Sequence, residues 1–177
     1  MSKSRLEAFS DTVVAVIMGV MALGMRRPAA SEWPALTPLL PVLLSYVLGF
    51  LYLGIAWMLH HRAFQGIERA NASIFWANLH WLFWVSLFPF AVNWLGDVRL
   101  LPAPAMSFGV LLLGVALSQY ILQLAITATW RADWRGLASV AMFAMGAIAG
   151  YKLPIVSVWL YGLAALLWMV PEKATAN

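Results

Sequence analysis

Six long apolar stretches constrain the fold of this chain more than any other feature of its sequence. They cover residues 6–25, 36–59, 74–95, 106–128, 137–151 and 153–170. A helix that crosses the hydrocarbon core of a bilayer needs about 20 mostly apolar residues. The last two stretches are short and are separated by little more than Lys152 and Pro154, which predicts a tight helical hairpin. We therefore expect an all-α polytopic membrane protein, with six transmembrane helices in a single domain over residues 1–177.

The composition excludes an ordinary soluble domain. Of the 177 residues, 63% are hydrophobic and 10% are charged, whereas about a quarter of a soluble domain is charged. A small globule is mostly surface and cannot bury this much apolar area, but lipid can cover it. The chain has no cysteine, which rules out disulfides, thiolate metal sites and cysteine nucleophiles. The expected partner is therefore the lipid bilayer.

The basic residues predict an orientation in the membrane. The net charge is +4, and the basic residues are spread over several loops, which does not indicate nucleic-acid binding. Six spans place both termini on one side, and that side then holds Lys3, Arg5, Arg62, Arg69, Arg131, Arg135 and Lys173. The other side holds Arg26, Arg27, Arg99 and Lys152. Because loops rich in lysine and arginine stay in the cytoplasm, cytoplasmic termini are expected.

Ionisable residues stand at the head of the first stretch. Arg5, Glu7 and Asp11 begin a helix that soon enters lipid, with Ser10 beside them. Such groups are costly at membrane depth unless they pair or face water. A helix cap with an interfacial cluster explains them without any functional site. From these residues alone, that structural interpretation is favoured.

Two neighbouring stripes continue along the first stretch. Small residues recur at Ala15, Gly19 and Ala22, and larger apolar residues recur at Val16, Val20 and Leu23. Small residues allow close packing of membrane helices, whereas apolar rings can constrict a pore. Taken alone, the spacing favours helix packing for both stripes.

Three motifs together resemble one known family. Residues 5–11, RLEAFSD, are similar to the signature of the transmembrane protein 175 family, the endolysosomal potassium channels and their bacterial relatives. Trp57 followed by His60-His61-Arg62 resembles the end of the family's second helix. Asn78 and the segment VSLFPF, residues 85–90, resemble its third helix. The matches keep their order and cover roughly the first 90 residues.

This resemblance implies a potassium-permeable cation channel in the inner membrane of a prokaryote, assembled as a homotetramer around the first helices. It implies pore constrictions at Val16, Val20 and Leu23, where relatives carry bulkier side chains. It places Gly19 at a pore-lining selectivity position where relatives have threonine. It also implies a structural network that comprises Arg5, Phe9, Ser10, Asp11, His60, His61 and Asn78. The implied permeant ion is potassium, and no cofactor is implied.

Other functions remain as alternatives. A secondary transporter or proton-coupled carrier is the first, and a non-conducting membrane scaffold is the second. An enzyme is not expected, because the sequence has no motif that pairs a nucleophile with a base. A metal site is not expected either, because adjacent histidines on a helix point in different directions. Gln119, Gln123 and Thr127 share one helix face, and interhelical hydrogen bonding is favoured there over a water-lined path.

Overall fold

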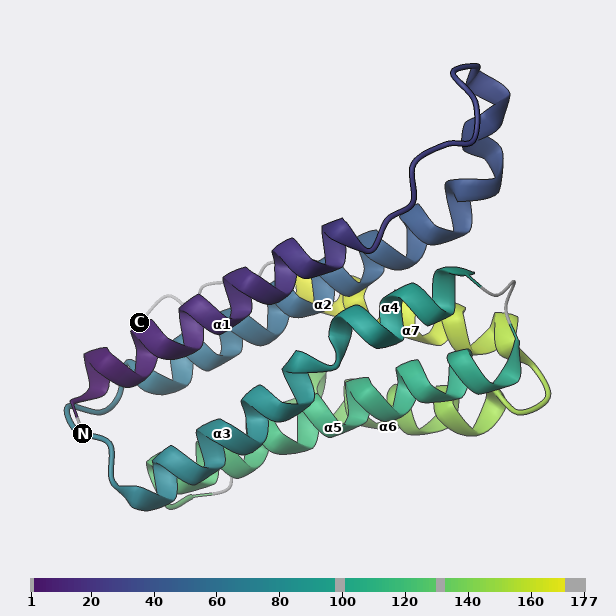
Figure 1. Cartoon of the computed structure of the whole chain (residues 1–177). Helices are drawn as coiled ribbons and strands as arrows, with labels where there is room; N and C mark the ends of the chain where they lie inside the picture. The colour runs from purple at the N-terminus through teal and green to yellow at the C-terminus, as the bar shows by residue number, and fades with distance from the viewer. Residues whose placement is uncertain (1, 98–100, 130–132, 171–177) are drawn as a thin grey trace.

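The structure, a computed structural model, describes residues 2–97, 101–129 and 133–170. Its regular elements within these ranges are all helices (Figure 1). They are α1 (Lys3–Leu23), η1 (Trp33–Leu39), α2 (Leu40–Phe64), α3 (Ala72–Ser86), α4 (Phe88–Asp97), α5 (Pro102–Thr127), α6 (Trp134–Ala149) and α7 (Pro154–Met169). The all-α prediction is therefore confirmed. Arg99, Arg131 and Lys173, which entered the orientation argument, lie outside the described residues.

The third expected helix is two helices in the structure. α3 ends at Ser86, and α4 begins at Phe88. Pro89 explains the break, because proline has no N–H and its ring crowds the carbonyl four residues earlier. The N–H of Leu87 donates instead to the carbonyl of Trp84, three residues earlier, at 3.2 Å. Together α3 and α4 still form one membrane span, so six spans remain.

Helix length separates the spans into two groups. Within the described residues, four helical segments are long and apolar enough to cross a membrane: Lys3–Leu23, Trp33–Phe64, Ala72–Asp97 and Pro102–Thr127. α6 and α7 are apolar but have only 16 residues each. At 1.5 Å per residue each is about 24 Å long, which is shorter than a hydrocarbon core of about 30 Å. These two helices depend on packing against the longer ones.

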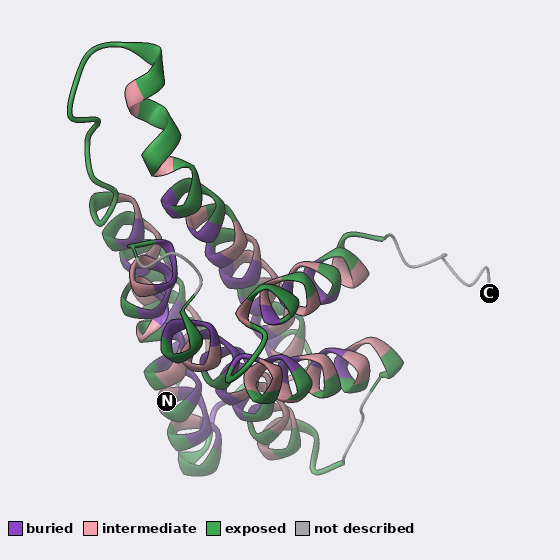
Figure 2. Ribbon diagram, turned by 90° about the vertical axis from the view of Figure 1, so that its right-hand side faces the viewer, coloured by how far each residue is buried: buried purple, intermediate pink, exposed green. Residues whose placement is uncertain are grey.

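The helices pack side by side with a shared core. α1 lies antiparallel to α2, and α3 lies beside α5 (Figure 1). Figure 2 shows the buried residues on the inward faces and the exposed residues on the outside. At the end where α1 begins, Arg135 in the first turn of α6 donates to the carbonyl of Val170 after α7. The described chain therefore starts and finishes toward one end of the bundle, as six spans require.

One tyrosine holds the α6–α7 hairpin to the rest of the bundle. Tyr161 of α7 is fully buried, and its hydroxyl donates to the carbonyl of Ala105 at 3.0 Å. Its own carbonyl accepts from the hydroxyl of Tyr52 at 2.5 Å. A Cβ at either Gly109 or Gly146 would collide with the Tyr161 side chain. Both glycines are therefore needed for the close approach of α5, α6 and α7.

Candidate functional site

α1 buries one face in the bundle. Its buried residues are Leu6, Ser10, Val14, Ile17 and Met21. Their spacing of three or four residues is that of one helical stripe. Four of the five are apolar, so Ser10 is the buried polar group that must find a partner.

The opposite face of α1 is uncovered in the single chain. Val16, Val20 and Leu23 expose 59%, 45% and 85% of their surface. Gly19 lies on the same exposed face, and a Cβ placed on it would meet no other atom within 4 Å. Phe9 is also exposed, at 48%. The structure thus brings the expected constriction residues and Gly19 together on one apolar surface that the other helices of the chain do not cover.

Three polar side chains anchor the buried face of α1. The amide nitrogen of Asn78 donates to the Ser10 hydroxyl at 3.0 Å, and Asn78 Oδ1 lies 2.7 Å from His60 Nε2. Ser10 also donates to the carbonyl of Leu6 at 2.9 Å. All three side chains are at least 99% buried. A hydrogen-bonded triad therefore joins α1, α2 and α3, and it leaves no unsatisfied group at the Ser10 position.

Aromatic rings enclose the histidine of this triad. His60 stacks between Trp81 and Phe64, with ring centroids 4.4 Å and 4.6 Å away. The other histidines point elsewhere: His61 stacks on Trp57, and His80 accepts from the indole N–H of Trp84. Among the described residues, no group of three or more His, Cys, Asp or Glu side chains is placed to hold a metal ion. The three histidines therefore do not converge on one site.

Asp11 has a different partner from the one expected. The indole N–H of Trp57 donates to Asp11 Oδ1 at 2.9 Å, so the aspartate joins α1 to α2 through a tryptophan. The resemblance placed Asp11 in one network with His60 and His61, but these histidines are hydrogen bonded to Asn78 and Gln65 instead. Arg5 is exposed at the start of α1 and forms no hydrogen bond or ion pair with the part of the chain that the structure describes. The structure thus brings together Ser10, His60 and Asn78, places Asp11 and His61 around Trp57, and leaves Arg5 and Phe9 outward.

The other end of α1 is tied to α4. A Cβ on Gly24 would overlap the Asn93 side chain, so the end of α1 touches α4 closely. Just beyond it, Arg26 Nη2 lies 3.4 Å from Asp97 Oδ2. This exposed ion pair contributes little stability, but it places a carboxylate beside one of the two arginines that follow α1. This ion pair was not predicted from the sequence, because Arg26 and Asp97 lie 71 positions apart in the chain.

The comparisons with known proteins match this chain to one family. The family model described as the endosomal/lysosomal potassium channel TMEM175 matches residues 5–89. A potassium channel from Chryseobacterium sp. (strain P1-3) is 36% identical over 98% of this chain and 95% of its own length. A potassium channel from Streptomyces collinus is 33% identical over 52% of this chain and 47% of its own.

One solved structure has the same fold. It is the crystal structure of a lysosomal potassium-selective channel TMEM175 homologue from Chamaesiphon minutus. It superposes with a TM-score of 0.81 over 94% of this chain and 96% of that chain, at 21% sequence identity. The likeness in fold extends well beyond the segment that carries the sequence motifs.

Proposed function

Since this chain belongs to the endosomal/lysosomal potassium channel TMEM175 family, we propose that it forms a potassium-permeable pore lined by α1. The family is one of ion channels, not of enzymes, and the protein is a multi-pass membrane protein. Potassium as the permeant ion, the inner membrane of a prokaryote as the location and cytoplasmic termini are parts of the proposal.

The observation that carries this proposal is the division of α1 into two faces. One face is anchored by Ser10 through Asn78 and His60, and by its apolar neighbours. The other presents Val16, Val20 and Leu23, which are exposed in the single chain. A helix held rigidly on one side and uncovered on the other is suited to line a channel. Apolar rings at these positions would restrict ion flow as hydrophobic constrictions do.

One such helix cannot surround a pore. Several copies of the chain must therefore meet around an axis, and closed rotational symmetry is the usual arrangement of identical subunits. We propose four copies, so that Val16, Val20 and Leu23 each form a ring. The exposed side of α1, which holds 11 of its 21 residues, would then face the axis and the neighbouring subunits.

Purified protein in a planar lipid bilayer tests the proposal. We expect unitary current steps with potassium on both sides, and a reversal potential that follows the potassium gradient when sodium replaces potassium on one side. Saturable, electrically silent uptake into vesicles without current steps would identify a carrier instead. Absence of both current and uptake, in protein that remains folded, would favour a scaffold.

A further inference from the structure

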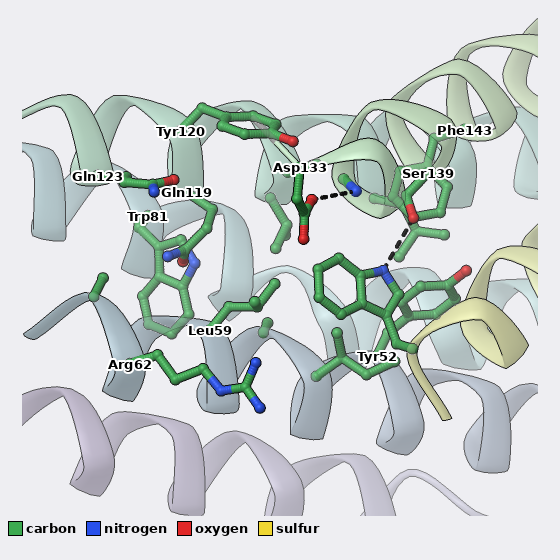
Figure 3. Close-up of a pocket in the computed structure, with 18 of the residues that line it drawn as sticks. Tyr52, Leu59, Arg62, Trp81, Gln119, Tyr120, Gln123, Asp133, Ser139 and Phe143 are labelled. Carbon is green, nitrogen blue, oxygen red and sulfur yellow. Dashed lines mark hydrogen bonds between the residues drawn. The ribbon is translucent and has the colours of Figure 1, made fainter. Parts of the chain in front are cut away.

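A cavity of about 650 Å³ lies inside the single chain, on the side of α2 away from α1. Figure 3 shows α2 on one side of it and α5 and α6 on the other, with α1 below α2, farther from the cavity. Its volume is within the range of ligand pockets. Because α1 contributes no lining residue, this cavity is separate from the proposed ion path.

The cavity wall is mostly apolar, with two glutamines set into it. Ile55 and Leu59 of α2 face Leu112, Val115 and other residues of α5 across the space. Gln119 and Gln123 lie one helical turn apart on α5 and project into the same space (Figure 3). The expected interhelical hydrogen bonds do not form: neither glutamine side chain is hydrogen bonded within the residues that the structure describes.

Two buried polar atoms near this wall have no partner. They are Oε1 of Gln119 and Nε1 of Trp81, and they are the only such side-chain atoms among the described residues. Both residues line the cavity. Leaving a buried amide or indole without a hydrogen bond is energetically costly. Turning the Gln119 amide about its last bond exchanges its oxygen and nitrogen, so this unrestrained group can offer a donor or an acceptor to the cavity.

We propose that the cavity binds an uncharged amphiphile, an alkyl chain that ends in a hydroxyl or amide group. The chain would lie along the wall formed by Ile55, Leu59, Leu112 and Val115. The head group would both donate to and accept from the glutamines of α5. A hydroxyl or an amide does both, which matches the free hydrogen-bonding capacity of Gln119.

The charge and polarity of the lining residues do not suit two other kinds of occupant. A charged head group is not matched, because the two charged residues of the lining, Arg62 and Asp133, are solvent-exposed and opposite in charge. Burying an unpaired charge there would be far more costly than burying a hydroxyl. Water alone is not matched either, because buried water needs two to four polar partners per molecule and most of this wall offers none.

The cavity is linked to the anchor of α1 by one ring. Trp81, which lines the cavity, stacks on His60 at 4.4 Å, and His60 is bonded to Asn78 and through it to Ser10. An occupant that shifts Trp81 therefore acts on the residues that hold α1. The binding site itself does not rest on the proposed channel function.

Photolabelling of the full-length protein in lipid nanodiscs tests the site. The probe is an eight-carbon alcohol that carries a diazirine, and labelled peptides are mapped by mass spectrometry. We expect label on cavity-lining residues of α2 and α5, protection by excess octan-1-ol and no protection by octanoate. Ala116→Trp fills the cavity and should reduce this label at least about fivefold, since the space is lost. Leu117→Trp, which places the same side chain on the exposed side of α5, should leave it unchanged.

Gln119→Leu keeps the volume and removes the hydrogen-bonding group, so it should weaken protection by octan-1-ol about tenfold. Label that is confined to lipid-facing residues, or that is unaffected by Ala116→Trp, would overturn the proposal. Equal protection by octanoate would overturn the uncharged class. Cavity labelling in a protein that carries no current would refute the channel function and leave this site standing.

Discussion

At the scale of single residues, Ser10 is set apart from another buried serine by a partner on a different helix. Ser10 and Ser118 are both buried, and each donates to a carbonyl in the preceding turn of its own helix. Only Ser10 also receives a hydrogen bond, from Asn78. Replacing each serine by alanine therefore isolates the contribution of the triad to the stability of the protein.

We expect Ser10→Ala to lower the free energy of unfolding by about 1–2 kcal/mol more than Ser118→Ala, because it leaves Asn78 with an unpaired buried donor. Thermal unfolding of the two variants in the same detergent measures the difference. Equal losses would mean that the triad does not stabilise the position of α1.

The exposed stripe of α1 allows a matched test of the constriction. Val20 and Val47 are both valines with 45% of their surface exposed, on α1 and α2 respectively. If Val20 lines the pore, Val20→Ala widens an apolar ring, and we expect at least about a twofold rise in current with weaker potassium-over-sodium preference. Val47→Ala should change neither. Single-channel amplitude and reversal potential measure both quantities, and identical behaviour of the two variants would remove Val20 from the ion path.

Gly19 permits the opposite change. Nothing lies within 4 Å of a Cβ at Gly19 or at Gly54 of α2, so both accept a larger side chain without a clash. We expect Gly19→Thr to raise potassium preference, because it would place a hydroxyl ring in the pore, while Gly54→Thr leaves selectivity as it is. The measurement is the reversal potential with potassium on one side and sodium on the other. No shift in Gly19→Thr would show that this position does not contact the ion.

At the scale of helices, the short hairpin of α6 and α7 depends on glycine contacts. Gly146 of α6 lies against the Tyr161 ring, whereas Gly162 of α7 has no atom within 4 Å of a Cβ position. We expect Gly146→Leu to prevent close packing of the hairpin and to cost several kcal/mol, as overpacking does. Gly162→Leu should be tolerated. Size-exclusion chromatography after heating reports the fraction of each variant that stays folded, and equal survival would contradict this account.

At the scale of the whole molecule, the uncovered face of α1 must be covered by further copies of the same chain. We expect the purified protein to have four times the 19.6 kDa mass of the chain, because a closed ring covers the apolar stripe on every copy. Val16→Phe should keep that mass and abolish the current, since added bulk closes the ring without touching the anchored face. Mass photometry of both proteins gives the assembly state. A monomer that still conducts would refute the arrangement.

The sequence alone determined the number of spans and the family. The length of an apolar stretch is a local property of the sequence, and it decides whether a helix can span a bilayer. Each of the motifs at residues 5–11, 60–62 and 85–90 is likewise a continuous segment of the chain. The family resemblance also implied a network that contains Ser10, His60 and Asn78, and the structure joins these three side chains by hydrogen bonds.

Only the tertiary structure decided which side of each helix faces inward. In a membrane protein the core-facing and lipid-facing sides are both apolar, so hydrophobic periodicity does not distinguish them. This is why the sequence left Val16 and Val20 open to two interpretations, why it did not predict Trp57 as the partner of Asp11, and why it assigned Gln119 and Gln123 to helix contacts when they line a cavity. Packing geometry over long sequence separations, not local chemistry, fixes those choices.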